Sequence, residues 1–250
     1  MSACMTTVRT LSILIKSGHA LDFERVLASN YEKLIAPGDV VVDIGAHTGK
    51  HFDRFVSLVG DTGKALAFEP LTECAGFLQG RYGDRSNVKI HNLALSNFRG
   101  TAEFISVTNS PEESGLREKI YNDPDRILNK TTVSVDTLDV MLSEEPRINF
   151  IKIDVEGAEI SLLEGARACL ARTRPFVSVE YGFPSYSAYG NTKSTLFDAA
   201  KSMQYVCADL YGNIIGNVED WEKVCDAVYW DYILVPDERV NEFAQRVAGI

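Results

Sequence analysis

The sequence predicts an α/β fold in which helices cover both faces of a mostly parallel sheet. Short, nearly continuous apolar segments alternate with segments of helical pattern along most of the chain, as is typical of buried parallel strands joined by helices. A turn spaced by Gly45 and Gly49 follows the first apolar strand, and Glu69 ends the next strand about 20 residues further on. The 250 residues fit a single domain, 1–250, that buries a core without disulfides or metal.

The first half of the chain is expected to form strand–helix units after a helical N-terminal segment, 1–37. Each expected strand is a short run of mostly apolar residues, and each expected helix spaces its apolar residues with a helical period. The elements expected there are helix 20–35, strand 39–44, helix 49–59, strand 64–69, helix 71–82 and strand 88–93.

A polar region interrupts the alternation between two β segments, 101–107 and 131–135. Residues 108–130 are rich in Ser, Asn, Asp, Glu and Pro, so they are expected to form a mobile surface insertion. The pattern then resumes and ends in a hairpin. The elements expected there are a helix start within 135–142, strand 148–154, helix 157–172, strand 175–181, helix 193–203, strand 204–210, turn 211–213 and strand 227–235.

Composition and charge disfavour several classes of protein. The formal net charge of −10 and the lack of a Lys/Arg run argue against a nucleic-acid partner, because a phosphate backbone attracts clustered basic residues. No segment approaches the roughly 18 apolar residues of a membrane-spanning helix, so no membrane partner is expected. The scattered cysteines, odd in number and without a CxxC pair, indicate reduced thiols in a cytoplasmic protein. They are Cys4, Cys74, Cys169, Cys207 and Cys225.

The turn after the first strand has the character of a cofactor-binding loop. It reads Gly-x-x-x-Gly, and Phe52 stands where the dinucleotide fingerprint would have its third glycine. A looser turn suits a ligand without pyrophosphate, such as S-adenosylmethionine; the alternative is a turn with only a structural role. Asp43 is expected to orient the network around the amino-acid portion, Glu69 to bind the ribose, and 94–96 to flank the adenine. The predicted cofactor-binding residues are Asp43, Gly45, Ala46, His47, Thr48, Gly49, Glu69, Pro70, Ala94, Leu95, Ser96 and Asp154.

A second group of acidic residues falls at the ends of two later strands. Asp154 ends one strand, Glu156 lies just beyond it, and Glu180 ends the next strand. In an open α/β sheet, ligands bind at the carboxyl ends of the strands, so these three residues are the catalytic candidates. Structural roles are the alternative to catalytic roles for the acidic residues of this segment. Glu156 could be a helix N-cap, and Glu159 could interact favourably with the helix dipole from the first turn. Lys152, within an apolar strand, is expected to reach a carboxylate.

At these residues the chain resembles the FkbM-like family of S-adenosylmethionine-dependent O-methyltransferases. The resemblance implies a class I methyltransferase, a Rossmann-like three-layer sandwich with a seven-stranded sheet in the order 3-2-1-4-5-7-6 and strand 7 antiparallel. It also implies S-adenosyl-L-methionine as cofactor and methyl transfer to a hydroxyl group of a sugar, polyketide or other small secondary metabolite. His47 stands where the family often has Asn. The matching segments are 43–49, 68–70, 92–96, 135–139 and 152–159, within a resemblance that covers 35–182.

Methyl transfer to an alcohol requires a group that accepts the hydroxyl proton. Asp154 is the first candidate for this base, with Glu180 and Glu156 behind it, and His51 can face the cofactor from the residues after the turn. The three carboxylates could instead gather Mg²⁺, which prefers oxygen ligands. Because no ligand spacing in the sequence supports a metal site, none is predicted.

The acceptor and the wider function are less constrained. Acceptor specificity is expected in 108–130 and 183–195, and the aromatic residues of 181–189 suit a carbohydrate or flat acceptor as well as simple packing. One alternative function is a nicotinamide-dependent (NAD) oxidoreductase, which the missing third glycine and the lack of an evident Tyr-x-x-x-Lys pair disfavour. Another is a catalytically idle cofactor-binding or scaffold protein. A homo-oligomer is compatible with the sequence.

Overall fold

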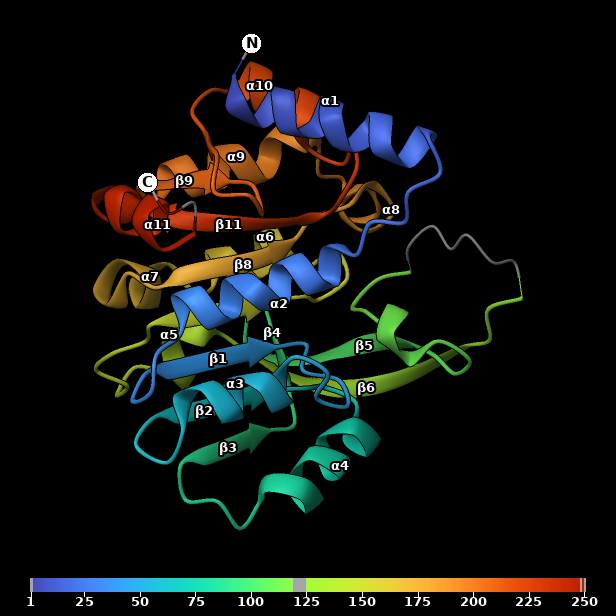
Figure 1. The fold of residues 1–250 in the computed structure, drawn as a ribbon. Helices are drawn as coiled ribbons and strands as arrows, with labels where there is room; N and C mark the ends of the chain where they lie inside the picture. Colours follow the sequence, from blue (N-terminus) through green and yellow to red (C-terminus); the bar gives the residue numbers. More distant parts are fainter. Residues whose placement is uncertain (1, 119–124, 248, 250) are drawn as a thin grey trace.

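The computed structural model describes residues 2–118, 125–247 and 249, and its central feature is a largely parallel sheet of eight strands (Figure 1). The sheet order is β10-β9-β11-β8-β7-β1-β2-β3. The neighbours from β8 to β3 are parallel, whereas β11 runs antiparallel to both β8 and β9. The strands are β1 (Val40–Ile44), β2 (Lys64–Phe68), β3 (Val88–His91), β7 (Phe150–Ile153), β8 (Phe176–Glu180), β9 (Tyr205–Ala208), β10 (Ile214–Ile215) and β11 (Asp231–Pro236).

The expectation of seven strands is corrected at one edge of this sheet. The two-residue strand β10 pairs with β9 and adds an eighth strand. The segment between β10 and β11, for which no helix was expected, contains the helix α10 (Val218–Val224). Asn217 caps this helix by accepting the N–H of Asp220 at 2.9 Å, and the indole of Trp221 is fully buried. This terminal hairpin therefore carries its own packed helix.

Helices cover both faces of the sheet. The helix α3 connects β1 to β2, and the pair α6–α7 connects β7 to β8. These two connections step toward opposite edges of the sheet, so right-handed crossovers place α3 and α6–α7 on opposite faces. In Figure 1, α2 and α3 lie in front of the sheet. The remaining helices are α1 (Ala3–Lys16), α2 (Phe23–Leu34), α3 (Phe52–Val59), α4 (Thr72–Tyr82), α5 (Leu138–Met141), α6 (Glu159–Glu164), α7 (Arg167–Thr173), α8 (Phe183–Tyr186), α9 (Lys193–Ser202) and α11 (Val240–Val247).

Two expected helices differ from the structure for local reasons. The helix expected at 49–59 begins only at Phe52, because the preceding residues form the glycine turn. The helix expected at 157–172 is broken into α6 and α7 around Gly165. A Cβ at Gly165 would lie 2.0 Å from the carbonyl oxygen of Ser96, so the chain passes close against the backbone of Ser96 at this point.

A second sheet of three strands stands beside the first, in the order β4-β6-β5. Its strands are β4 (Ala94–Leu95), β5 (Gly100–Val107) and β6 (Leu128–Asp136), and β5 and β6 form a long antiparallel hairpin. The expected insertion at 108–130 is the tip of this hairpin, except that 128–130 pair with β5 and belong to β6. The short 3₁₀ helix η1 (Pro111–Glu113) lies in the tip, whereas residues 119–124 are outside the described part of the chain.

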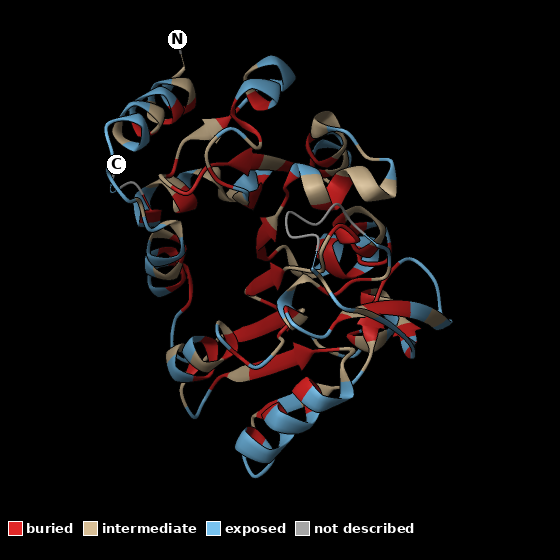
Figure 2. Ribbon diagram, turned by 90° about the vertical axis from the view of Figure 1, so that its right-hand side faces the viewer, coloured by how far each residue is buried: buried red, intermediate tan, exposed pale blue. Residues whose placement is uncertain are grey.

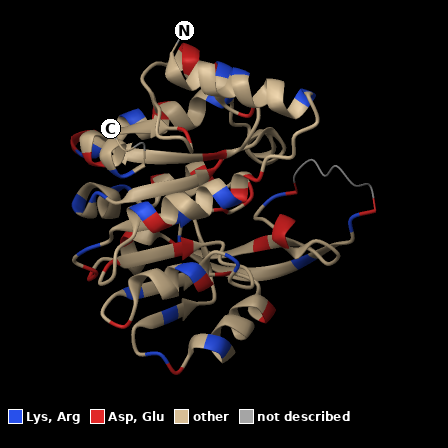
Figure 3. Cartoon of the chain, in the orientation of Figure 1, with Lys and Arg blue, Asp and Glu red and all other residues tan. Residues whose placement is uncertain are grey.

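The core follows from the apolar character of the central strands. Every residue of β1 and β7 is buried, and Figure 2 shows the strands buried while the outer faces of the helices are exposed. Acidic and basic residues are interspersed along the chain (Figure 3). All five cysteines are free and buried. Within the described ranges, no helix has both the length and the apolar character needed to cross a membrane.

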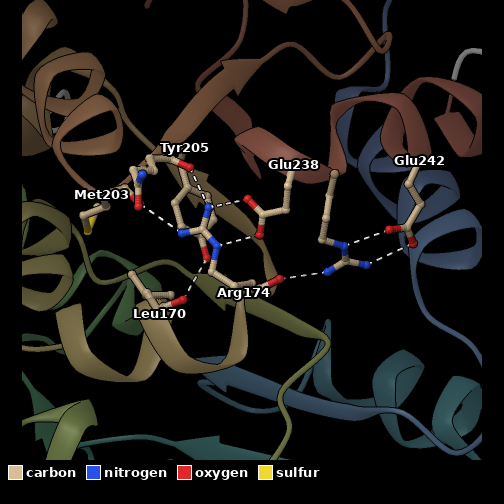
Figure 4. Close-up of polar contacts among 8 residues, drawn as sticks. Leu170, Arg174, Met203, Tyr205, Glu238 and Glu242 are labelled. Atoms are coloured by element: carbon tan, nitrogen blue, oxygen red, sulfur yellow. Dashed lines mark hydrogen bonds and ion pairs between the residues drawn. The ribbon is translucent and has the colours of Figure 1, made fainter.

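A cluster of arginine contacts closes the amino end of β8 (Figure 4). Arg174, in the left-handed conformation at φ 49° after α7, binds both carboxylate oxygens of Glu238 at 2.7 Å. Its guanidinium also donates to the carbonyls of Met203 and Gln204 at 3.0 and 2.7 Å, and it lies 4.5 Å from the ring centre of Tyr205. Arg174 therefore joins α7, β9 and the turn after β11, on the side of the sheet away from the carboxyl ends of the parallel strands.

Candidate active site

A cavity of about 300 Å³ lies at the carboxyl ends of β1, β2, β7 and β8. Its volume is at the lower end of the range of roughly 300–1,000 Å³ that is usual for small-molecule sites. The cavity sits where the strand order reverses direction between β1 and β7, which is the usual position of ligands in open α/β sheets. The turns after β1 and β2, the loop after β7 and the tip of the β5–β6 hairpin form its walls.

The glycine turn lines the cavity through Gly45, Ala46 and His47, and only a glycine fits at position 45. Gly45 has φ 82°, and a Cβ at this position would lie 1.8 Å from the carbonyl oxygen of Asp154. The Gly45 N–H donates to the carbonyl of Phe68 at 2.9 Å, so the turn is held against both neighbouring strands. Gly49 has φ 94°, and a Cβ there would lie 2.8 Å from the Leu78 side chain. Glycine at both positions therefore lets the turn pack closely against its neighbours in a conformation that other residues rarely adopt.

Glu69 ties the two turns together at the edge of the cavity. One carboxylate oxygen accepts the N–H of His47 and the other accepts the N–H of Leu71, each at 2.8 Å. The side chain is only 4% exposed, and burial raises the pKa of Glu69 to about 7 although the two backbone hydrogen bonds act to lower it. Each carboxylate oxygen still has a lone-pair site for a ligand hydroxyl. Glu69 is thus fixed in a position from which it can bind a ribose.

Most of the predicted cofactor-binding residues line the cavity, and four do not. Asp43 is buried beneath the turn, and neither carboxylate oxygen has a hydrogen-bond partner among the described residues. Burial raises the pKa of Asp43 to about 7, against the opposing effect of Lys152. Ser96 is turned toward Asp136, whose carbonyl accepts the Ser96 N–H at 3.0 Å. The residues that line the cavity are Gly45, Ala46, His47, Glu69, Pro70, Ala94, Leu95 and Asp154; those that do not are Asp43, Thr48, Gly49 and Ser96.

Asp154 and Glu180 reach the cavity together, and Asp154 pairs with a buried lysine. The Lys152 Nζ lies 2.7 Å from Asp154 Oδ2, which confirms that the strand lysine reaches a carboxylate. Burial acts to raise the pKa of Asp154, but Lys152 and hydrogen bonding with Glu180 outweigh it and bring the pKa to about 2. Burial and the negative charge of Asp154 raise the pKa of Glu180 well above its usual value. The two carboxyls are therefore driven apart in pKa, with the lower pKa on Asp154 and the higher one on Glu180.

Glu156 lines the cavity from a strained loop. It has φ 57°, an uncommon conformation for a residue with a Cβ, and it accepts a hydrogen bond from the Ser185 hydroxyl at 3.2 Å. The N-cap interpretation of Glu156 is wrong, because α6 begins only at Glu159. Glu159 lies in the first helical turn and accepts the N–H of Gly157 at 2.9 Å, which holds the loop that carries Glu156.

His51 also faces the cavity, as expected. Its Nδ1 lies 3.3 Å from the Tyr31 hydroxyl, and its Nε2 lies 3.7 Å from a carboxylate oxygen of Glu24. Burial, together with the positive charge of Lys152, lowers the pKa of His51 to about 3, so the ring is neutral. Both ring nitrogens thus face groups on α2, which fix the orientation of the imidazole.

The sequence analysis missed the residues that reach the cavity from distant parts of the chain. Glu24 comes from α2, and its carboxylate lies 3.0 Å from the Lys50 ammonium. The hairpin contributes Phe104, Pro111, Glu112, Ser114 and Leu116. The isolated apolar positions inside the polar segment 108–130 are the one sequence signal that marks part of this contribution.

The aromatic residues after β8 have mainly a packing role. Tyr181 and Tyr186 are buried and stacked, with ring centres 4.6 Å apart, and the Tyr181 hydroxyl donates to the Thr192 carbonyl at 2.7 Å. Phe183 is exposed, and Tyr189 packs on Gly157. None of these rings lines the cavity, so the interpretation as an acceptor platform there is wrong.

The three candidate carboxylates do not form a metal cluster. Within 2–118, 125–247 and 249, no group of three or more His, Cys, Asp or Glu side chains is arranged to hold a metal ion. One oxygen of Asp154 is already engaged by Lys152.

The open α/β sheet, the cavity at its switch point and the glycine turn define a Rossmann-like protein of the class I methyltransferase fold. Comparison with known proteins identifies the family within this fold. The sequence model of the methyltransferase FkbM domain matches residues 43–207, more than half of the chain. The chain therefore belongs to the FkbM methyltransferase family and is a methyltransferase, and its cofactor is S-adenosylmethionine.

The individual proteins that the chain resembles share low sequence identity with it. A curated protein, the 2-O-methyltransferase NoeI of Sinorhizobium fredii, is 28% identical over 178 residues, which are 66% of this chain and 71% of that protein. The crystal structure of a methyltransferase FkbM from Methylobacillus flagellatus is 16% identical with a TM-score of 0.49, and the match covers 92% of this chain and 58% of that one. A SAM-dependent O-methyltransferase from Thermotoga maritima is 11% identical with a TM-score of 0.42, covering 90% and 71%.

The residues of the cavity fit this cofactor. The turn at Gly45, Ala46 and His47 lines the cavity beside Asp154, and the buried Glu69 offers a fixed acceptor. His47 Nε2 is buried at the cavity without a hydrogen-bond partner among the described residues, so one polar atom there is available to a ligand. The acidic lining also suits the positive charge of a sulfonium.

Proposed function

We propose that this methyltransferase transfers the methyl group to a hydroxyl group of a small molecule. The observation that carries the proposal is the charged Asp154 carboxylate at the cavity, beside the turn that would hold the cofactor. The curated relative is named as a 2-O-methyltransferase, which supports oxygen as the methyl acceptor. The family match also decides against the nicotinamide-dependent alternative.

The chain would hold the cofactor along the turns after β1 and β2. Gly45, Ala46 and His47 form the floor for the amino-acid portion, and Glu69 would accept hydrogen bonds from the ribose hydroxyls. Ala94 and Leu95 would flank the adenine. When bound, S-adenosylmethionine supplies a methyl group already activated by its sulfonium. Accordingly, the main task of the protein is to position the acceptor and to exclude water.

Asp154 is the proposed proton acceptor. Its low pKa keeps it charged at physiological pH, so it is always in the form that can receive a hydroxyl proton. It is a weak base, but a weak base is sufficient where the leaving group is already activated. Burial and the charge of Asp154 raise the pKa of Glu180, so Glu180 ranks behind Asp154 as a base and serves as a hydrogen-bond partner of that carboxylate. Glu156 is placed to contact the acceptor.

The acceptor would enter between α2 and the hairpin tip. Glu24 and Lys50 border the cavity on one side, and Ser114 and Leu116 border it on the other. The hairpin tip overlaps the segment 108–130 that was expected to set acceptor specificity. A sugar, a polyketide or another secondary metabolite with a free hydroxyl would fit this description.

A ligand-binding experiment tests the proposal. S-Adenosylmethionine and S-adenosylhomocysteine are expected to raise the melting temperature, because a ligand of the native state stabilises it, whereas NAD is expected to have no effect. Methylated product from a panel of sugars and polyketide alcohols would be identified by mass spectrometry. Stabilisation by NAD alone would contradict the proposal, and binding without methylation of any acceptor would favour a catalytically idle protein.

A further inference from the structure

A row of polar side chains crosses the buried centre of the sheet. Asp43 on β1, Lys152 on β7 and Ser178 on β8 are register partners, so their side chains leave the sheet on the same face. Each is at most 2% exposed. Buried strands of parallel sheets are normally apolar throughout, so three polar residues in register on neighbouring strands require an explanation.

Lys152 is the only ammonium in this row, and its contacts are directed toward the cavity. Its Nζ donates to Asp154 Oδ2 at 2.7 Å, and the Lys152 side chain is 3% exposed while that of Asp154 is 26% exposed. The lysine is therefore under the cavity and Asp154 is at its surface. Burial alone would favour a neutral amine, but Asp154 and Asp43 outweigh it and raise the pKa of Lys152.

We propose that Lys152 is a positioning residue for methyl transfer, whose buried ammonium fixes the Asp154 carboxylate at the cavity in its charged form. A salt bridge this deeply buried stabilises a fold little compared with an apolar pair of similar volume. Asp43, the register partner of Lys152 on β1, adds a second negative charge near the lysine and also precedes the glycine turn. The row thereby connects the base of the cofactor turn to the residue proposed to take the acceptor proton.

Several groups on other elements face the same pair and contribute to the charge balance. Lys152 lies near the carboxyl groups of Asp43, Asp154 and Asp231, and Asp231 on β11 is the register partner of Glu180 on β8. Burial raises the pKa of Asp231 to about 7. The charged or titratable groups that interact electrostatically with Lys152 or Asp154 are Tyr31, Asp43, His51, Glu69, Glu159, Glu180 and Asp231.

The test compares Lys152→Met with a control lysine variant. The control is Lys64, the first residue of β2, which also pairs with a carboxylate, that of Glu145. This pair lies at the amino end of the strand, away from the cavity. Lys152→Met is expected to lower kcat by about 10- to 100-fold, as for a misplaced catalytic group, while the affinity for S-adenosylhomocysteine changes far less. The acidic limb of the pH–kcat profile is expected to move to higher pH. Lys64→Met is expected to leave kcat and the profile unchanged.

The kcat measurements rest on the proposed function, because they require methyl transfer to a hydroxyl group. A second measurement that does not depend on turnover tests the inference separately. Infrared titration of the protein without cofactor would follow the protonated-carboxyl band, with Asp154→Asn identifying the contribution of Asp154. In Lys152→Met this carboxyl is expected to become protonated at a higher pH than in the parent. The same titration midpoint in both proteins would overturn the inference, even if methylation had been demonstrated.

A double variant keeps the test decisive if Lys152→Met alone does not fold. Lys152→Met combined with Asp154→Asn removes both charges, so it leaves no unpaired buried ion between the two. If Lys152 acts through Asp154, the double variant has the same kcat as Asp154→Asn alone. A further loss of tenfold or so in the double variant would show an independent role and would overturn the inference.

Discussion

The carboxylate of Glu69 accepts the backbone N–H of His47 at 2.8 Å, although the two residues lie on different strand-to-helix turns. This bond ties the end of β2 to the turn after β1, and the Leu71 N–H engages the second oxygen of the same carboxylate. Because the carboxylate is held at both oxygens, its orientation toward the cavity is set before any ligand binds. Preorganisation of this kind reduces the ordering cost of binding.

Glu69→Gln is therefore expected to weaken binding of S-adenosylhomocysteine by about 1–3 kcal/mol, the usual cost of losing hydrogen bonds to a charged group. One side-chain atom becomes a donor and can no longer accept either a backbone N–H or a ribose hydroxyl. Isothermal titration calorimetry measures the change. Glu73→Gln, on the exposed start of α4, is the matched control. Equal dissociation constants for Glu69→Gln and the parent would show that Glu69 does not bind the ribose.

Gly45→Ala tests the close approach of the turn to Asp154. An alanine Cβ would lie 1.8 Å from a backbone carbonyl oxygen, and φ 82° is itself unfavourable for alanine, so the turn must move. We expect cofactor affinity to fall at least tenfold and the melting temperature to drop. Gly76→Ala in α4 is the control, because its Cβ meets nothing within 4 Å and alanine favours a helix. A Gly45→Ala protein with parental affinity would contradict the assignment of this turn.

Asp154→Asn separates a role in proton transfer from a role in binding. The asparagine keeps the shape of the side chain but cannot accept the hydroxyl proton, so kcat is expected to fall about 10²–10⁴-fold. The dissociation constant of S-adenosylhomocysteine is expected to change much less, because asparagine keeps the size and shape of the side chain beside the cofactor turn. Single-turnover kinetics would measure the chemical step directly. Parental turnover in this variant would exclude Asp154 as the base.

The main strands and the carboxylates at their ends could be predicted from the sequence, because apolar runs of parallel strands end where polar residues begin. The placement of the Asp43 side chain on the same sheet face as Lys152 could not be predicted, because it depends on the register of β1 with β7. Glu24 was missed because the packing of α2 over the sheet is non-local. The break near Gly165 was missed because its cause is a contact with Ser96, far away in the sequence.

Glu159 is expected to make stability depend on pH. Burial raises the pKa of Glu159 to about 8 from an ordinary value near 4.5, so the folded protein binds this proton more tightly than the unfolded chain. Its stabilising contribution is complete below the ordinary pKa and is lost as the pH rises through about 8. Glu159→Gln should remove this loss, so the variant is expected to be less sensitive to alkaline pH. Urea unfolding of both proteins at acidic and alkaline pH gives the comparison; parallel stability curves would count against the raised pKa.

Arg174→Ala is expected to destabilise the fold while leaving the cavity unchanged. The substitution removes two charge-assisted bonds to Glu238 and two bonds to the carbonyls of Met203 and Gln204, and it leaves part of α7, β9 and the following turn without their shared partner. Because hydrogen bonds of charged groups contribute roughly 1.5–3 kcal/mol, and exposed ion pairs much less, we expect a total loss of about 2–4 kcal/mol in the free energy of unfolding. Lys130→Ala, which removes an exposed ion pair with Glu103, is the control and should keep the parental melting temperature. The affinity for S-adenosylhomocysteine should be the same in both variants and the parent, since the Arg174 cluster lies at the opposite end of β8 from Glu180. A loss of affinity in Arg174→Ala at a temperature where the protein is fully folded would instead mean that the two ends of β8 are coupled.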